Sequence, residues 1–286
     1  MRSLLFVPGH DARKLAKAPD AGADALILDL EDSVPEGEKA RARQVCAEFV
    51  AAHRERLPLF VRINGLATGH ALPDLAAVVR AAPHGIMLPK CEGRRDVERL
   101  ADWLSALEAR DGLPPQSTRI LPIVTETAAS LFRLGGYAEA REPRLCGLMW
   151  GGEDLAADLG ATANRDSGGR YAAPYELARS LTLLGAAGAQ VAAVDAIHAD
   201  FRDLAGLQAE AEAALRDGFS AKAAIHPDQV GPINAAFTPS PDAVAWARQV
   251  VAALDASGGA AVALEGKMLD RPHYRAAQRI IARCGG

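Results

Sequence analysis

The chain contains the stretch Ile120-Leu121-Pro122-Ile123-Val124-Thr125-Glu126, and a second stretch of the same kind follows, Leu148-Met149-Trp150-Gly151-Gly152-Glu153-Asp154. Each is a short apolar run followed by an acid, and runs of this length are typical of strands buried in a parallel sheet. In an α/β barrel, functional side chains lie at the C-terminal ends of such strands. Glu126 and Asp154 are therefore expected to converge on one small volume.

Two carboxylates that converge in this way repel each other unless a cation lies between them. Mg²⁺ relieves the repulsion, because it binds one or two carboxylates and fills its other positions with water and substrate oxygens. The alternative is that Glu126 caps the helix that follows it and Asp154 is the N-cap of the next one. Spacing alone leaves both interpretations open.

Outward from these runs, short apolar segments alternate with helical patterns. The expected strands are 4–8, 25–31, 59–64, 85–90, 120–126, 147–151, 192–197 and 221–226. The expected helices are 11–18, 36–53, 72–82, 94–110, 128–138, 175–187 and 204–217. This alternation predicts a parallel α/β sheet, and eight repeats within roughly 230 residues favour closure into a (β/α)8 TIM barrel. A doubly wound open sheet is the alternative, but no GxGxxG follows the first strand.

Residues 1–238 are thus expected to form the barrel domain and residues 239–286 a C-terminal helical extension. Two prolines precede a helix expected at 242–257, Gly258-Gly259 ends it, and a last helix is expected at 274–283. An extension that is not needed to close the barrel must pack on its rim, cover its mouth or reach a neighbouring subunit.

Composition excludes several classes of protein. Hydrophobic residues make up 49% of the 286 residues, enough for the core of one large α/β domain. The net charge is −4 with scattered basic residues, so no nucleic-acid or membrane-surface partner is expected. No secretory leader or membrane-spanning run is expected either, which predicts a cytoplasmic location. The four cysteines are far apart and form no CxxC, which predicts reduced thiols.

Polar side chains also follow other expected strands. Asp29, Glu31 and Asp32 lie at the end of the second strand, and a buried Asp29 is costly unless it faces a cation or ordered water. Arg62 lies near the end of the third strand, where its planar guanidinium suits a substrate carboxylate. An ion pair between Arg62 and Asp29 or Glu31 is the alternative. Lys90 adds a positive charge at the end of the fourth strand.

Eight short motifs occur in order along the chain. They are Arg2-Ser3-Leu4-Leu5-Phe6-Val7-Pro8-Gly9, Leu28-Asp29-Leu30-Glu31-Asp32-Ser33-Val34, Arg62-Ile63-Asn64, Pro89-Lys90, Glu126-Thr127, Gly151-Gly152-Glu153-Asp154-Leu155, Gly218-Phe219-Ser220-Ala221-Lys222-Ala223-Ala224-Ile225-His226-Pro227 and Gly266-Lys267-Met268-Leu269-Asp270-Arg271-Pro272-His273. Together they span almost the whole chain. They resemble the citrate lyase beta-subunit-like (CitE-like) branch of the HpcH/HpaI aldolase superfamily, which includes malyl-CoA and citramalyl-CoA lyases. Leu269 departs from the isoleucine that is commoner in that pattern.

The resemblance implies a Mg²⁺-dependent carbon–carbon lyase on a TIM barrel, with Mn²⁺ as the alternative ion and coenzyme A as part of the substrate. By position, Glu126 and Asp154 match the metal ligands, and Arg62 matches the residue that binds the keto-acid half. Asp270 matches an aspartate that reaches the active site of a neighbouring subunit, in a homotrimer or a dimer of trimers.

The resemblance implies roles for further residues as well. The implied substrate-binding residues are Arg62, Glu126, Gly152, Glu153 and Asp154, the acids near the metal's water shell are Asp29, Glu31 and Asp32, and the cations near the coenzyme A phosphates are Arg13, Lys14 and Lys17. The backbone N–H groups of Gly152, Glu153 and Asp154 open a helix, where they suit the far carboxylate of the substrate.

The expected reaction breaks the C2–C3 bond of a citryl-, citramalyl- or malyl-type thioester, giving an acyl-CoA and a 2-keto acid (oxaloacetate, pyruvate or glyoxylate). A metal polarises the hydroxyl and the carboxylate beside it. Arg62 then stabilises the oxyanion, and Asp270 protonates the enolate carbon. The motifs do not choose among the three substrates.

Two other functions are considered. A class II keto-acid aldolase independent of coenzyme A typically relies on a histidine beside the second strand end, where this chain has acids. A non-catalytic binding or scaffold subunit that acts with an acyl carrier protein is the other alternative. A degenerate scaffold should have lost at least one of the four residues Glu126, Asp154, Arg62 and Asp270, and all four are present.

Overall fold

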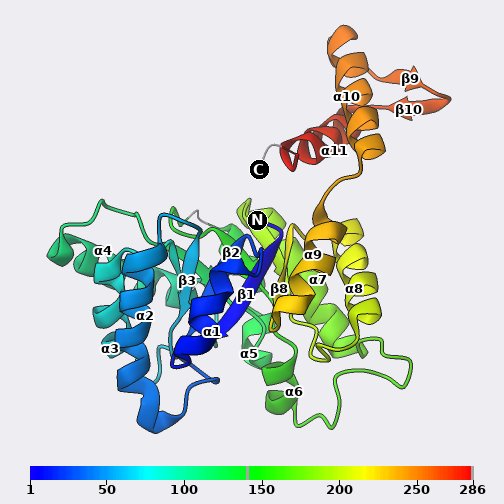
Figure 1. The fold of residues 1–286 in the computed structure, drawn as a ribbon. Helices are drawn as coiled ribbons and strands as arrows, with labels where there is room; N and C mark the ends of the chain where they lie inside the picture. Colours follow the sequence, from blue (N-terminus) through cyan, green and yellow to red (C-terminus); the bar gives the residue numbers. More distant parts are fainter. Residues whose placement is uncertain (140–141, 285–286) are drawn as a thin grey trace. The chain divides into compact units, whose positions relative to one another are not determined.

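The computed structural model describes residues 1–139 and 142–284. The chain divides into two compact units, Met1–Ile233 and Asn234–Gly286. The first unit contains an eight-stranded parallel sheet in the order β5-β4-β3-β2-β1-β8-β7-β6 (Figure 1). The strands are β1 (Ser3–Pro8), β2 (Ala25–Asp29), β3 (Leu59–Arg62), β4 (Gly85–Leu88), β5 (Arg119–Pro122), β6 (Gly147–Met149), β7 (Ala192–Asp195) and β8 (Ala221–Ala224).

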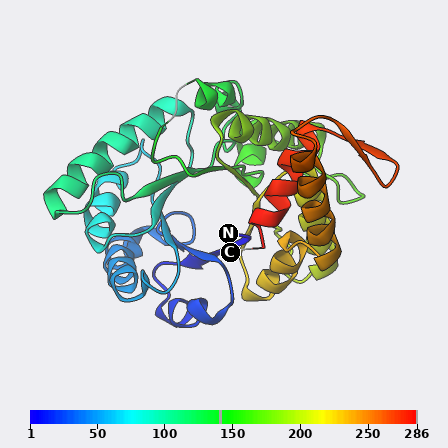
Figure 2. The ribbon, with the colours of Figure 1, turned by 90° about the horizontal axis from the view of Figure 1, so that it is seen from above.

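The two ends of this sheet meet, because β5 and β6 are joined by parallel bridges. The bridges are Ile120 to Leu145 and Ile123 to Met149, and the amide of Val124 donates to the Met149 carbonyl at 2.8 Å. Seen from above, the strands of the first unit form a ring with its helices around the outside (Figure 2). The predicted TIM barrel is therefore confirmed, and the doubly wound open sheet is wrong.

The helices of this unit are α1 (Ala12–Lys17), α2 (Lys39–His53), α3 (Ala71–Val78), α4 (Arg94–Asp111), α5 (Ala128–Leu131), α6 (Glu153–Leu159), α7 (Ala173–Ala189) and α8 (Leu204–Asp217), and α9 (Val230–Phe237) crosses the unit boundary. Helices occur in all seven expected ranges, and α6 and α9 lie outside those ranges. Short 3-10 turns are η1 (Ala18–Asp20), η2 (Glu36–Glu38), η3 (Val79–Ala81), η4 (Leu134–Ala138) and η5 (Pro227–Gln229). The helix expected at 128–138 is thus split, because Gly135 and Gly136 weaken it.

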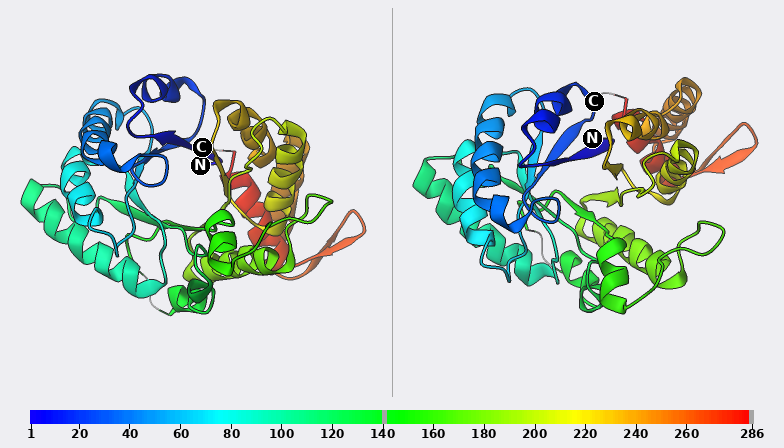
Figure 3. Two further views of the ribbon diagram at one scale, coloured as in Figure 1. Left: turned by 90° about the horizontal axis from the view of Figure 1, so that it is seen from below. Right: turned by 60° about the horizontal axis from the view of Figure 1, so that its bottom comes forward.

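The inside of the barrel is filled by side chains from the strands and from the residues that follow them. This buried cluster is Leu4, Ala25, Ile27, Phe60, Met87, Leu121, Ile123, Met149, Val194, Ala221 and Ala223. Both views of Figure 3 show that the strands of this unit stay on the inner side of its helices. β5 and β6 also end before the stretches that lead to the two acids end, at Pro122 and Met149. Glu126 consequently lies in the loop before α5, and Asp154 lies in the first turn of α6.

The second unit is built from α10 (Pro241–Ala256), β9 (Val262–Leu264), β10 (Lys267–Leu269) and α11 (Arg271–Ala282). Its own core is Ala247, Val250, Leu254, Leu269 and Ala277. The β9–β10 hairpin was not expected, since two three-residue strands are too short to show alternation. Its turn, Glu265 and Gly266, has φ values of 47° and 75°, as a two-residue hairpin turn of type I′ requires.

The cysteines match the expectation of free thiols. All four are free, with Cys46 and Cys91 buried, Cys146 half-buried and Cys284 exposed. No helix within the described residues is long and apolar enough to cross a membrane.

Candidate active site

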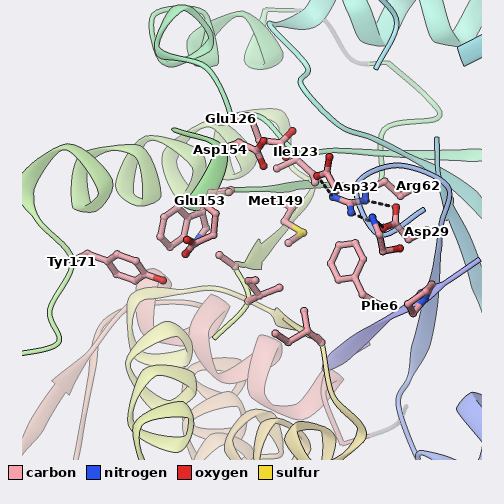
Figure 4. A pocket seen from close by; sticks show the side chains of 18 residues that line it. Phe6, Asp29, Asp32, Arg62, Ile123, Glu126, Met149, Glu153, Asp154 and Tyr171 are labelled. Atoms are coloured by element: carbon pink, nitrogen blue, oxygen red, sulfur yellow. Dashed lines mark hydrogen bonds and ion pairs between the residues drawn. The ribbon is translucent and has the colours of Figure 1, made fainter. Parts of the chain in front are cut away.

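A cavity of about 310 Å³ lies at the C-terminal ends of the barrel strands. Its wall includes seven of the residues singled out in the sequence: Asp29, Asp32, Arg62, Glu126, Gly152, Glu153 and Asp154. Figure 4 labels six of these side chains at the cavity, Asp29, Asp32, Arg62, Glu126, Glu153 and Asp154. The barrel thus brings together residues that are far apart in the sequence.

Glu126 is a buried acid of the cavity wall. Its side chain is only 4% exposed, and one of its oxygens accepts a hydrogen bond from the backbone amide of Lys90. Burial raises the pKa of Glu126 to about 8, and the negative charges of Glu31 and Asp154 add to the rise, against the Lys90 amide. Glu126 and Asp154 therefore lie close enough to repel each other.

The capping alternative for these two acids is wrong. The N-cap of α5 is Thr127, whose side chain accepts from the Ser130 amide at 3.3 Å, and the N-cap of α6 is Gly152. Neither Glu126 nor Asp154 is an N-cap residue. Their carboxylates extend to the cavity instead.

The donor set suits a hard divalent cation. Glu126 and Asp154 offer only oxygens, and a buried carboxylate beside other acids is relieved by a cation. No group of three or more His, Cys, Asp or Glu that could enclose a metal was found within the described ranges. Two carboxylates, with water and substrate oxygens in the other positions, are a ligand set that Mg²⁺ prefers.

Arg62 and Asp29 form a two-pronged ion pair. Nε and Nη2 of Arg62 donate to the two carboxylate oxygens of Asp29, each at 2.7 Å, and the side chains are 12% and 2% exposed. Burial opposes ionisation of Asp29, but the hydrogen bonds and charge of Arg62 outweigh it and lower its pKa. Asp29 was expected to face a cation, and Arg62 is that cation. For Arg62, an ion pair with Asp29 was the alternative to binding a substrate carboxylate.

The outer edge of Arg62 faces two further acids. Nη1 lies 3.1 Å from Glu31 and 3.5 Å from Asp32, and the guanidinium lies over the ring of Phe6 at 5.0 Å. Burial alone would lower the pKa of Arg62, but Asp29 and then Glu31 and Asp32 raise it. Arg62 therefore keeps its positive charge at the cavity wall.

Lys90, after β4, connects acids that follow three other strands, β2, β5 and β6. Its ammonium lies 2.6 Å from Glu31, 3.5 Å from Asp154 and 3.7 Å from Asp32, while its amide holds Glu126. The pKa of Lys90 is raised, because its hydrogen bond and attraction to Glu31 outweigh its burial. The sequence showed Lys90 as a cation at this level, but no site role was predicted for it.

One wall of the cavity is apolar and aromatic. Trp150 is fully buried, its Nε1 donates to Asp195 at 2.7 Å, and the ring of Tyr171 packs edge-on against it at 4.9 Å. Phe6 and Met149 continue this wall. These residues were missed because in sequence an apolar cavity wall looks like ordinary core, and Tyr171 lies in a loop without a pattern.

The remaining predicted residues lie elsewhere. Arg13, Lys14 and Lys17 are exposed on α1, and none of the three is among the described residues that form the cavity wall. Asp270 belongs to the second unit, where it is the N-cap of α11 and lies 2.6 Å from Nδ1 of His273. Their roles stay predictions.

Comparison with known proteins identifies relatives along the whole chain. Residues 2–227 match the family profile of HpcH/HpaI aldolase/citrate lyase. The mitochondrial citramalyl-CoA lyase of Rattus norvegicus is 32% identical over 296 residues, which cover 98% of this chain and 85% of that protein. The citrate lyase subunit beta-like protein of Mycobacterium tuberculosis is 37% identical over 281 residues, with 98% and 94% covered. The crystal structure of CitE from Mycobacterium tuberculosis with magnesium, acetoacetate and coenzyme A has a TM-score of 0.79 at 35% identity, with 100% and 98% covered.

Proposed function

This chain belongs to the HpcH/HpaI aldolase/citrate lyase family, and we propose that it is a Mg²⁺-dependent lyase that cleaves a 3-hydroxyacyl-CoA thioester. The products are an acyl-CoA and a 2-keto acid. The observation that carries the proposal is the pair of strand-end carboxylates, Glu126 and Asp154, beside the Arg62 cation in one cavity. Relatives named for citramalyl-CoA and citrate lyase activity support the same reaction class.

In this proposal Glu126 and Asp154 hold the metal ion. When bound, Mg²⁺ supplies Lewis acidity toward the hydroxyl and the adjacent carboxylate of the substrate. The amides that open α6, from Gly152 to Asp154, provide N–H donors for the far carboxylate. A carboxylate of the cavity rim accepts the hydroxyl proton as the C2–C3 bond breaks.

The electron pair of that bond passes to C2 and gives the thioester enolate. Arg62, fixed by Asp29, contributes a positive charge to the wall at which negative charge develops. The apolar side of the cavity, with Phe6, Met149 and Trp150, keeps water from the enolate. Asp270 supplies the proton that converts the enolate carbon to the acyl-CoA product.

We further propose that Asp270 acts in the cavity of a neighbouring subunit of a homotrimer. The support is that Asp270 lies outside the barrel unit, at the start of α11 and directly after a tight hairpin. Three further predictions from the sequence belong to this proposal. They are contacts of Arg13, Lys14 and Lys17 with coenzyme A, an acyl carrier protein as the alternative partner, and a cytoplasmic location.

The proposed function is tested by a cleavage assay across malyl-, citramalyl- and citryl-CoA, with Mg²⁺ and with a chelator. Cleavage of one thioester that requires the metal supports the proposal and names the substrate. Cleavage of a free hydroxy-keto acid instead would favour the aldolase alternative. Activity only on a carrier-bound thioester would identify an acyl carrier protein as partner.

The position of Asp270 is tested with mixed oligomers. Subunits carrying Asp270→Ala and subunits carrying Glu126→Gln are co-expressed with different tags, and the mixed oligomer is purified. If Asp270 acts in the neighbour, some cavities combine an intact barrel with an intact Asp270, and cleavage returns. No recovery above either parent, in an oligomer shown to be mixed, places Asp270 in its own subunit or outside the mechanism.

A further inference from the structure

A third acid, Glu31, lies close to the two proposed metal ligands but is held by cations. Its side chain is 7% exposed, with Oε1 2.6 Å from the Lys90 ammonium and Oε2 3.1 Å from Nη1 of Arg62. The same ammonium lies 3.5 Å from the Asp154 carboxylate, so Glu31 and Asp154 share one cation. Glu31 is therefore an acid at the metal site that is committed to other partners.

Lys90 contacts both proposed ligands as well. Its backbone is in the left-handed region, with φ at 49°, a conformation that non-glycine residues rarely adopt. In this conformation its N–H donates to Glu126, while its side chain lies 3.5 Å from Asp154 and 2.6 Å from Glu31. One residue thus connects the third acid to the first two.

We propose that Lys90 is a positioning residue that holds Glu31 away from the metal ion, so that coordination positions stay open for the substrate. The proposal rests on the proposed function. A Mg²⁺ ion has six positions and binds carboxylates strongly. A third carboxylate would take a position that the substrate needs and would add negative charge that weakens the Lewis acid.

The proposal predicts that removing the Lys90 ammonium strengthens Mg²⁺ binding. In Lys90→Met most of the stem is kept but the ammonium is gone, so Oε1 of Glu31 loses its partner and can bind the ion, while Oε2 stays beside Arg62. We expect Mg²⁺ to bind about tenfold more tightly, since one nearby positive charge is removed and one ligand is gained. In the presence of Mg²⁺, pyruvate or oxaloacetate should bind about tenfold more weakly, because its coordination position is occupied. A lysine that merely supports the fold or the ligands would give weaker Mg²⁺ binding when removed.

Two double variants with the same net charge separate ligand entry from simple charge. Lys90→Met with Glu31→Gln removes the carboxylate that is expected to enter, and Mg²⁺ affinity should return to within about threefold of wild type. Lys90→Met with Asp32→Asn removes an equal charge 3.7 Å from the Lys90 ammonium but leaves Glu31 in place, and binding should stay tight. Equal restoration by both doubles would overturn the proposal, because charge alone would then explain the effect.

The experiment is isothermal titration of the full-length protein with MgCl₂, and then with pyruvate or oxaloacetate at saturating Mg²⁺. Arg99→Met, at an exposed residue of α4, removes one positive charge away from the cavity and should leave Mg²⁺ affinity unchanged. Lys90→Gly is a second route to the same loss if Lys90→Met does not fold, because glycine accepts the left-handed backbone and keeps the N–H.

The two levels of inference fail differently. No Mg²⁺ binding by the wild-type protein would overturn the proposed function itself. Mg²⁺ binding by wild type, with equal or weaker binding by Lys90→Met and Lys90→Gly, would leave the proposed function standing and overturn the role of Lys90. Tighter binding in both, reversed by Glu31→Gln and not by Asp32→Asn, supports it.

Discussion

Replacing Arg62 by lysine should damage both stability and turnover, although the charge is conserved. Arg62 makes two charge-assisted hydrogen bonds to Asp29, each at 2.7 Å, and Asp29 is 2% exposed. An ammonium on a flexible stem can replace only one of the two, and it loses the stacking on Phe6. A lost hydrogen bond to a buried charged group costs about 1.5–3 kcal/mol. The expected loss in the free energy of unfolding is therefore about 2 kcal/mol.

The assay combines urea unfolding with steady-state kinetics, and Asp29→Asn is the matched variant. Both substitutions weaken the same ion pair, but only Arg62→Lys replaces the guanidinium that is proposed to stabilise the oxyanion. If Arg62 stabilises the oxyanion, Arg62→Lys should lower kcat/KM by about 10²-fold or more, and by clearly more than Asp29→Asn does. Equal losses of activity in the two variants would reduce Arg62 to a partner of Asp29. If the free energy of unfolding of Arg62→Lys lies within about 0.5 kcal/mol of wild type, the second hydrogen bond from Arg62 to Asp29 does not contribute as argued.

Three further predictions concern other parts of the chain. Glu126→Gln and Asp154→Asn should each weaken Mg²⁺ binding by a few kcal/mol in titration calorimetry, because ligand charge supplies much of the affinity, and wild-type activity that survives a chelator would contradict this. Burial opposes ionisation of Glu108, but its hydrogen bonds with Arg144 and with the amides of Thr118 and Gln116 outweigh it and lower its pKa to about 2. Because the pKa of Glu108 is lower in the folded protein, this stabilisation of about 3 kcal/mol is present above pH 4.5 and is lost as the pH falls toward 2. In urea unfolding across that range, the free energy of unfolding of Glu108→Gln should fall much less with decreasing pH than that of wild type. Gly9→Ala should destabilise the barrel by about 2 kcal/mol or more in thermal unfolding, since its Cβ would lie 2.5 Å from Cys46 Sγ and 2.6 Å from the Asp29 carbonyl, and an unchanged Tm would show that β1 can shift.

The barrel could be predicted from the sequence because strands that are buried on both faces consist of nearly continuous runs of apolar residues. The exact strand ends could not, because an apolar run does not reveal where the hydrogen-bonded ladder stops. β5 ends at Pro122 although its run continues to Thr125, and only the pairing with β4 and β6 decides this. The β9–β10 hairpin was missed since its strands are shorter than any detectable period.

The sequence singled out seven residues that line the cavity, but it did not show how they pair with one another. For Arg62 the sequence left a substrate carboxylate and an ion pair as equal alternatives. The structure shows the ion pair because β2 and β3 pair in a register that sets Asp29 directly opposite Arg62. Register between strands is a property of the folded sheet and is not encoded in either strand alone. The role of Lys90 depends in the same way on a left-handed backbone, which sequence patterns do not specify for a lysine.

The charges at the strand ends also limit how this cavity can bind its substrate. Two cations, Arg62 and Lys90, are surrounded by the five acids Asp29, Glu31, Asp32, Glu126 and Asp154. Nε of Arg62 and one N–H of its Nη2 are committed to Asp29, and Nη1 faces Glu31 and Asp32, so the two-pronged face of the guanidinium is not available to a second carboxylate. An anionic keto-acid half entering such a cavity would be repelled unless a further positive charge came with it. A divalent cation between Glu126 and Asp154, together with the N–H groups that open α6, supplies that charge, and the substrate carboxylate is therefore expected to depend on the metal for its binding more than on Arg62.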